Sequence, residues 1–334
     1  MGKIGKQTVI LKKKPNILCG YSVVGPKEGN GPMASYFDRI MSDDMCGQNT
    51  YEKAEQKFME KAVFGVIDKA NLKPQDIDMF LSGDLLNQII SATFTAREFD
   101  TTFIGLFGAC STMTESLAMG ACLVDGGYVN NVLCATCSHF ASAERQFRNP
   151  LELGTQRPPT AQWTVTGAGA TILECGVGGP YIEAVTFGKV SDYGITDVNN
   201  MGAAMAPAAM HTLKAHFTDL NRTPEDYDLI FTGDLGKLGS EILIDLMERE
   251  GFKLGINYND CGCLIFDKEQ KTFMGGSGCG CSASILNSYV LTKLLNKEVK
   301  SVLFLSTGAL LSPLSAQQGL SVPGIAHAIS IRSE

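Results

Sequence analysis

The sequence of 334 residues contains no apolar run that reaches the roughly 18–20 residues of a membrane-spanning helix, and residues 301–311 are too short. The first residues, MGKIGKQ, are basic, but no apolar core follows them, so we expect no secretory signal. Basic residues are outnumbered, with 28 Lys and Arg against 35 Asp and Glu, and the net charge of −7 argues against broad nucleic-acid binding. We therefore expect a soluble chain that is not secreted and is at most peripheral to a membrane.

The two CGC sequences do not have the spacing of a structural zinc site. The CGC sequences at residues 261–263 and 279–281 have a single residue between the cysteines, whereas structural zinc sites usually have about two to four. The GGSG sequence at residues 275–278 lacks the Lys-Ser/Thr of a phosphate-binding loop and is better explained as a tight turn. We predict no metal site and no cofactor. The 11 cysteines are an odd number in a long chain without an export signal, which indicates free thiols in a reducing compartment.

Apolar residues (44%) and charged residues (19%) are present at the levels of a globular protein. Helical periodicity predicts helices at residues 50–71, 203–220, 240–250 and 282–297. Short apolar runs predict strands at residues 7–11, 77–82, 102–106, 129–136, 166–173, 229–232 and 301–306, and a long strand that opens at about residue 181. Residues 20–35 are rich in glycine and proline and are predicted to form a loop. Helices that alternate with short apolar strands are typical of an α/β fold.

An internal repeat divides the chain. PQDIDMFLSGDL at residues 74–85 recurs as PEDYDLIFTGDL at residues 224–235, so Asp84 and Asp234 are corresponding residues. A second pair, ACS at residues 109–111 and GCS at residues 280–282, follows in the same order. Two unrelated halves would rarely share helix, strand and Gly-Asp-Leu in one order. The repeat predicts a duplicated unit packed against its copy, with halves at residues 1–180 and 181–334.

Cys110 lies within GLFGACST (residues 105–112), where small residues leave room for a ligand beside the thiol. Ser111 and Thr112 favour the start of a helix, because their short hydroxyl side chains accept hydrogen bonds from unpaired N–H groups there. The positive end of a helix dipole lowers the pKa of a nearby thiol and favours the thiolate. Cys110 is therefore a nucleophile or the floor of an anion pocket, unless it is a small buried core residue.

A cysteine that opens a helix in a duplicated α/β chain of this length resembles the thiolase and ketoacyl-synthase superfamily. Cys110 falls where that superfamily keeps its acyl-accepting cysteine, and GAGA at residues 167–170 resembles its strand before the crossover between domains. The resemblance implies a five-layered αβαβα fold, a homodimer, and an active site between the two halves.

Seven sequence blocks further resemble one family of this superfamily, the stage V sporulation AD proteins. They are GPKE (25–28), GDLLNQ (83–88), LFGACST (106–112), AERQFR (143–148), MAPAA (205–209), NDCG (259–262) and TGALLSP (307–313). The resemblance implies a cytosol-facing sporulation protein that binds dipicolinic acid, a small aromatic dianion, and assists its uptake into the developing spore. It also implies peripheral association with the forespore inner membrane, through integral-membrane proteins of the same transport set.

Departures from the superfamily pattern bear on mechanism. Condensing enzymes need a histidine, and a second histidine or an asparagine, to polarise the thioester carbonyl and move protons. The first should follow the strand at residues 229–232, where this chain has Gly233 and Asp234, and Cys279 stands at the second position. Cys110 thus has no evident base partner, and we predict a binding protein rather than an enzyme. The alternatives are an acyltransferase with Cys110 as the acyl-accepting nucleophile, and a scaffold with an empty pocket.

Six residues make up the predicted ligand site: Cys110, Asp234, Cys279, Ser277, His139 and Arg145. Arg145 and Arg148 could supply positive charge to a dicarboxylate, since guanidinium binds carboxylate bidentately, but both could instead be surface or dimer contacts. His139 follows a strand end and could instead be a structural histidine. For Asp84, a role in capping the next helix is the better explanation.

Overall fold

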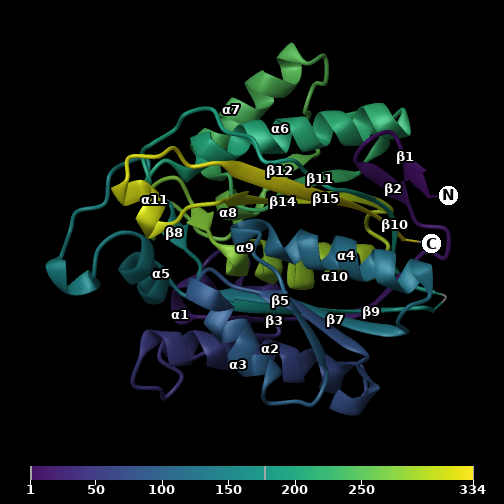
Figure 1. Ribbon diagram of the computed structural model, residues 1–334, viewed down its shortest axis with the longest axis horizontal. Helices are drawn as coiled ribbons and strands as arrows, with labels where there is room; N and C mark the ends of the chain where they lie inside the picture. Colours follow the sequence, from purple (N-terminus) through teal and green to yellow (C-terminus); the bar gives the residue numbers. More distant parts are fainter. Residues whose placement is uncertain (1, 177, 334) are drawn as a thin grey trace.

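The computed structural model describes residues 2–176 and 178–333, and its helices and strands form five layers (Figure 1). Helices make the two outer layers, with α6 (Met201–Leu220) and α7 (Gly236–Arg249) on one side and α2 (Tyr51–Lys69) and α3 (Ile90–Ala96) on the other. Two sheets lie inside them. The middle layer consists of α4 (Thr112–Gly126), α9 (Cys279–Ile285) and α10 (Leu291–Leu295). This arrangement confirms the predicted αβαβα fold class.

The two sheets have the same strand order. The first runs β6 (Thr102–Gly105), β5 (Met79–Gly83), β7 (Asn131–Ser138), β9 (Gly167–Glu174) and β3 (Asn16–Val24). The second runs β12 (Tyr258–Asp260), β11 (Leu229–Thr232), β14 (Ser301–Ala309), β15 (Gly324–Arg332) and β10 (Tyr181–Thr186). In each sheet the first three strands are mutually parallel, and the last two pair antiparallel. The predicted duplication is therefore confirmed.

The predicted boundary after residue 180 coincides with the start of β10, but the halves are closely joined. The strands β3 and β10 pair through Asn16 and Tyr181, and β2 (Thr8–Ile10) pairs with β10. Helix α4 of the first half contacts β14 and β15 of the second, while α9 of the second half contacts β7 and β9 of the first. The two halves therefore share one layer of helices.

Helix α4 is covered on both sides, and its sequence fits that position. Its fully buried apolar residues recur at helical spacing: Met113, Leu117, Ala121 and Val124. The hydroxyls of Thr114 and Ser116 are also buried, and each donates a hydrogen bond to a carbonyl one turn earlier. Gly120 allows close packing on β7, because a Cβ there would lie 3.1 Å from Cys134 Sγ.

The repeat extends to individual hydrogen bonds. The carboxylate of Asp78 accepts hydrogen bonds from the backbone N–H groups of residues 130 and 131. Asp228 accepts from those of residues 300 and 301 in the same way. Each aspartate thus joins the turn before a central strand to the start of its parallel neighbour, so both halves align these strands with the same device.

Three secondary-structure predictions need correction. Residues 20–24 belong to β3, although glycine and proline content predicts a loop from residue 20 onward. Gly20 lies in this strand because the middle layer approaches closely, and a Cβ there would come within 2.4 Å of the Asn287 side chain. The strand β15 has no predicted counterpart. The helix predicted at residues 282–297 starts at Cys279 and contains a π-helical segment, Leu286–Val290.

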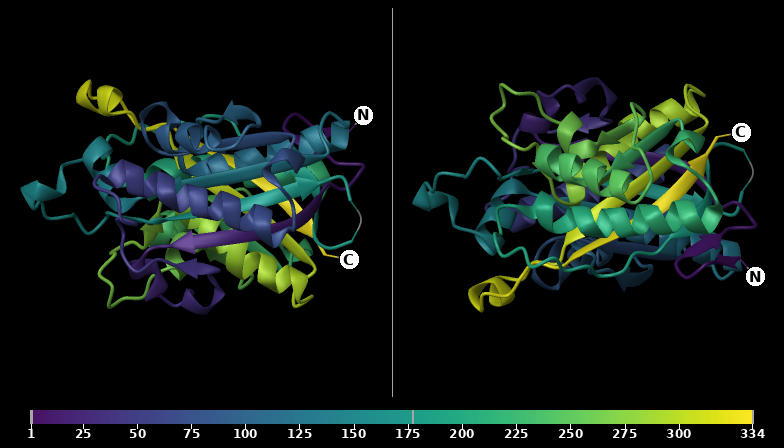
Figure 2. Two further views of the ribbon diagram at one scale, coloured as in Figure 1. Left: turned by 90° about the horizontal axis from the view of Figure 1, so that it is seen from below. Right: turned by 90° about the horizontal axis from the view of Figure 1, so that it is seen from above.

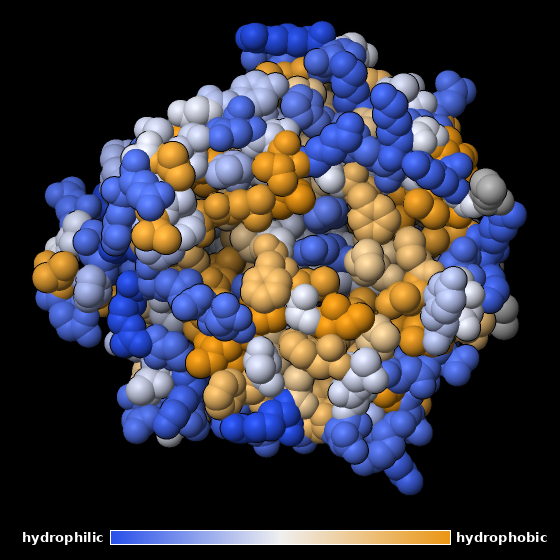
Figure 3. Space-filling model, in the orientation of Figure 1, coloured by the Kyte–Doolittle hydropathy of each residue, from blue (hydrophilic) through white to orange (hydrophobic). Residues whose placement is uncertain are grey.

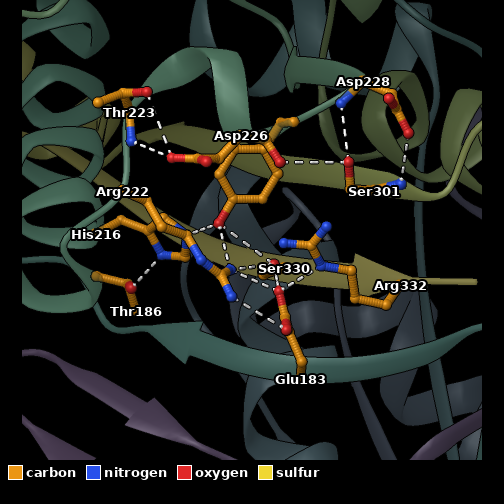
Figure 4. A network of polar contacts seen from close by, with 11 residues as sticks. Glu183, Thr186, His216, Arg222, Thr223, Asp226, Asp228, Ser301, Ser330 and Arg332 are labelled. Carbon is orange, nitrogen blue, oxygen red and sulfur yellow. Dashed lines mark hydrogen bonds and ion pairs between the residues drawn. The ribbon is translucent and has the colours of Figure 1, made fainter.

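A partly buried polar network stabilises the second half (Figure 4). The carboxylate of Glu183 on β10 accepts hydrogen bonds from Arg222 at 2.6 Å, Ser330 at 2.7 Å and Arg332 at 2.9 Å. Burial alone would raise the pKa of Glu183, but these hydrogen bonds outweigh it and lower the pKa to about 2. The ionised carboxylate is thus strongly favoured in the folded protein.

We expect Glu183→Gln to remove an acid-sensitive part of the stability. Because the folded pKa of Glu183 is depressed, its contribution is present above the ordinary pKa of 4.5 and is lost as the pH falls toward 2. In the wild type this loss should reach about 2 kcal/mol of the free energy of unfolding, with allowance for solvent screening of a partly exposed carboxylate. Urea unfolding at pH 7 and pH 3 measures it. The exposed Glu248→Gln is the control, and an identical pH dependence in both variants would contradict the prediction.

Candidate functional site

Cys110 lies where the two halves touch. A short loop after β6 leads to a 3-10 turn (Ala109–Ser111), and α4 follows directly. Ala109 has a φ of +51°, in the left-handed region that residues other than glycine rarely adopt, so the chain turns sharply before Cys110. A Cβ on Gly308 of β14 would lie 2.2 Å from Gly108 O. The glycine at position 308 therefore lets the second half pack against this turn.

A cavity of about 850 Å³ is lined by Cys110 and by residues of both halves. Residues 84–89 and Thr164 come from the first half, and Ser277 and residues 309–314 from the second. Leucine is the commonest residue of the wall, while the Cys110 thiol, three hydroxyls, three side-chain amides, one carboxyl group and one guanidinium add polar groups. The volume falls within the roughly 300–1,000 Å³ of small-molecule sites. The position of the cavity between the halves matches the expected place of the site.

The surroundings of Cys110 keep its thiol protonated. The Cys279 thiol lies beside it and donates a hydrogen bond to Ala109 O at 3.1 Å. A hydrogen bond with Cys279, burial, and the negative charge of Asp234 together raise the pKa of the Cys110 thiol well above its ordinary value. The expectation that the helix dipole lowers this pKa is therefore wrong, because α4 begins only at Thr112 and a buried carboxyl group opposes ionisation.

Asp234 connects three segments of the second half beneath the cavity. Its carboxylate accepts hydrogen bonds from Thr307 Oγ1 at 2.7 Å, Gly278 N at 2.9 Å and Ser277 Oγ at 3.2 Å. Burial raises the pKa of Asp234 to about 6 in spite of these donors. The structure thus brings together four of the six predicted site residues, namely Cys110, Asp234, Cys279 and Ser277.

Of these four, Cys110 and Ser277 line the cavity, whereas Asp234, Cys279 and the other two predicted residues do not. His139 caps α5 (Phe140–Phe147): its Nδ1 accepts from Ala141 N at 3.2 Å, and its Nε2 donates to Asp44 O at 2.9 Å. Both ring nitrogens are therefore occupied, as expected of a structural histidine. Arg145 is half exposed and forms an ion pair with Glu52 of α2, which holds it on the surface. The structure therefore corrects the predicted site at these two positions.

Asp84 and Arg148 line the cavity, although the predicted site contains neither. Asp84 accepts hydrogen bonds from Leu86 N and Ala92 N, both at 2.8 Å, so it does cap the start of α3. Burial raises the pKa of Asp84 to about 7. Arg148 follows the last residue of α5 with non-helical angles (φ −130°, ψ −101°), so helical spacing from Arg145 does not predict where its side chain lies.

The family of the chain follows from its sequence relatives. The family model of stage V sporulation protein AD (SpoVAD) matches residues 5–332. Stage V sporulation protein AD of Bacillus subtilis (strain 168) is 47% identical over 325 residues, which cover 97% of this chain and 96% of the relative. The chain belongs to the stage V sporulation protein AD family. This membership supports a role in sporulation.

Solved structures of condensing enzymes share the fold at low sequence identity. The 3-oxoacyl-[acyl-carrier-protein] synthase III of Aquifex aeolicus VF5 has a TM-score of 0.60 and 11% identity, over 95% of this chain and 99% of that one. A variant of OleA from Xanthomonas campestris has a TM-score of 0.63 and 11% identity, over 97% and 99% of the two chains. At this identity the likeness confirms the thiolase-type fold and carries no further conclusion.

No histidine is among the described residues that line the cavity. Besides His139, the chain has three histidines, and all three lie in the second half: His211 contacts Ser191, His216 contacts Thr186 and Tyr227, and His327 accepts from Gly188 N.

In the described part of the chain, no group of three or more His, Cys, Asp or Glu side chains is arranged to hold a metal ion. No helix within residues 2–176 and 178–333 combines the length and the apolar character needed to cross a bilayer.

We expect iodoacetamide at pH 7 to label Cys175 at least about tenfold faster than Cys110 in the folded protein. Cys175 is exposed, whereas Cys110 is buried and its raised pKa leaves little thiolate. Peptide mass spectrometry of timed samples measures both rates. In urea the two thiols should react at similar rates, which is the control. Equally fast labelling of Cys110 in the folded protein would contradict the described environment.

Proposed function

We propose that this chain binds dipicolinic acid in the cavity above Cys110 and assists its uptake into the developing spore, without catalysing a condensation. The observation that carries the proposal is a roomy cavity between the two halves, whose wall in the described chain includes no histidine. Membership of the stage V sporulation protein AD family supports the sporulation context.

The composition of the wall suits a small aromatic acid. Leu85, Leu86, Leu311 and Leu314 offer apolar contacts to a ring, and Thr164 offers a hydroxyl donor. A protonated thiol at Cys110 also adds no negative charge that would repel a carboxylate. These groups support binding of an anion rather than attack on a thioester.

An acyltransferase that uses Cys110 as its nucleophile is the second candidate. The position of the thiol on the cavity wall, in a fold shared with condensing enzymes, favours it. The nucleophile would have to be a thiolate, and the only acid group described beside it, Asp234, disfavours that state while ionised. We therefore place this activity second.

We further propose that the protein acts at the cytosolic face of the forespore inner membrane, where integral-membrane proteins of the same transport set receive the ligand. The end of the molecule that carries residues 148–158 and α11 (Pro313–Gln317) projects away from the end with both termini (Figure 2). Leu151, Leu153 and Leu314 are exposed on these projecting segments, close to the cavity. Such exposed leucines support docking to a membrane-embedded partner.

A homodimer is also part of the proposal. The strand β6 lies at the end of its sheet and pairs only with β5 among the described strands. Ile104 on β6, Phe107 after it and Met119 on α4 are exposed, and Figure 3 shows apolar side chains gathered on the face where α4 lies in Figure 1. An unpaired edge beside an apolar surface supports pairing of two copies. Phe107 also lines the cavity, so a second copy would adjoin the ligand site.

We expect calorimetric titration with dipicolinate to show saturable binding to the wild type and binding at least about tenfold weaker to Cys110→Ala, because the thiol is a polar group of the cavity wall. Cys122→Ala, which removes a thiol from the helix that follows Cys110, is the matched control and should bind as the wild type does.

The same proteins distinguish the second candidate. Incubation with acyl-CoA should leave the intact mass unchanged if the cavity is a binding site. A mass increase that disappears in Cys110→Ala, together with no heat from dipicolinate, would overturn the binding proposal and establish the acyltransferase.

For the dimer, we expect Ile104→Asp to convert the protein to a monomer, because a charge on the unpaired strand edge disfavours pairing with a second copy. Size-exclusion chromatography with light scattering measures the mass. Ile256→Asp, at a fully exposed position before β12, is the control and should remain dimeric. A monomeric wild type, or a dimeric Ile104→Asp protein with native circular dichroism, would refute this interface.

A further inference from the structure

Arg148 is the one cationic side chain among the described residues that line the cavity. Only about 10% of its side chain is exposed, as is 8% of its partner Glu144. A guanidinium cannot lose its proton in a protein, so this cation is permanently held in an apolar wall. Burial of a charge whose hydrogen-bond donors lack partners is unfavourable. The donors of Arg148 that have no partner in the protein therefore call for an explanation.

The Arg148 guanidinium has a strong hydrogen-bond acceptor on one side and none among the described residues on the other. Its Nη1 donates a hydrogen bond to Glu144 Oε1 at 2.7 Å. Its Nη2 has only a weak contact with Met201 Sδ at 3.9 Å, and its Nε has no hydrogen-bond partner among the described residues. The Nε and Nη2 groups form one edge of the planar guanidinium, and such an edge matches the two oxygens of a carboxylate.

The two neighbours of the guanidinium lie on different sides of the cavity wall. Glu144 lines a second, smaller cavity of about 290 Å³ and does not line the main one. Met201 lines the main cavity and not the second. Arg148 borders both cavities, and Met201, which its Nη2 contacts, lines the main one.

We propose that Arg148 binds a carboxylate group of the ligand in the main cavity through its Nε–Nη2 edge. This inference rests on the proposed function and deepens it, because it names the ligand group and the side chain that recognises it. The main cavity then selects small molecules with a carboxylate beside an apolar ring. Arg145, three residues earlier, is half exposed and paired with Glu52, so it has no such role.

Glu144 moderates the affinity. Its carboxylate already neutralises Arg148, so a bound carboxylate brings one uncompensated negative charge into the wall. In Glu144→Gln the amide oxygen can still accept the hydrogen bond from Nη1, but the competing charge is gone. This variant should therefore bind a carboxylate more tightly, a result that a purely structural role for Arg148 does not produce.

The experiment titrates the full chain with three probes: dipicolinate, pyridine-2-carboxylate and the uncharged pyridine-2,6-dicarboxamide. Arg148→Gln should weaken dipicolinate binding at least about tenfold while changing diamide binding little, so the preference for the acid shrinks. Arg148→Lys should also weaken it, because an ammonium keeps the charge but not the planar pair of donors. Glu144→Gln should tighten it severalfold. Arg145→Gln is the matched control and should bind as the wild type does.

The outcomes distinguish the role of Arg148 from the proposed function. Dipicolinate binding that is unchanged in Arg148→Lys and not tightened in Glu144→Gln overturns the role of Arg148 and leaves the proposed function intact. Arg148→Lys and Glu144→Gln still test the role of Arg148 if Arg148→Gln fails to fold, which thermal melts would reveal. A wild type that binds pyridine-2-carboxylate in an Arg148-dependent way, but not dipicolinate, refutes the proposed function and supports the carboxylate site. A wild type that binds none of the probes overturns both.

Discussion

Two sheets bury a single layer of helices between them, and this constraint determines both the packing of the halves and the position of the cavity. A helix in that layer packs against a sheet on each of two sides, so α4 fills both of these faces with apolar residues and with hydroxyls that bond to their own backbone, while Met119 remains exposed. Because the strands of each half carry their helices to the same layer, the N-terminal end of α4 meets the other half at Gly308. The cavity above Cys110 lies at that junction, so neither half contains a complete site.

The same burial determines the chemistry of the thiol. A cysteine at an exposed helix start would be a ready nucleophile, whereas this one is enclosed with a second thiol and a carboxyl group. Desolvation and a neighbouring negative charge act in one direction, and the dipole of a helix that begins two residues later does not compensate. The fold of a condensing enzyme thus surrounds a thiol whose ionisation is disfavoured, which agrees with use of the cavity for binding.

The charged groups of the main cavity differ from the net negative charge of the molecule. The chain carries a net charge of −7, yet the wall of its main cavity includes one buried guanidinium, that of Arg148, whose Nε has no hydrogen-bond partner among the described residues. Asp84, the acidic residue of that wall, is engaged by two backbone N–H groups, and burial raises its pKa to about 7. Protonated or hydrogen-bonded acids repel an anion less than free carboxylates do, so an acidic protein can still offer a site for an anion.

The sequence by itself determined the duplication, the fold class and the family. A repeat of helix, strand and Gly-Asp-Leu leaves little freedom, because identical local preferences in both halves produce the same strand order. It also predicted that Cys110, Asp234, Cys279 and Ser277 lie together, and they do, since the loops after corresponding strands meet at one end of the duplicated sheets. Only the tertiary structure decided the rest. Residues 20–24 of β3 are not predicted as a strand, because Gly20 suggests a loop. The structure shows that a glycine is needed there to make room for the side chain of Asn287 in another layer. The thiol pKa depends on burial and on groups more than 100 residues away in the chain, such as Asp234. Arg145 and Arg148 are near neighbours of one residue type, and the departure of Arg148 from helical geometry places one on the surface and the other in the cavity wall.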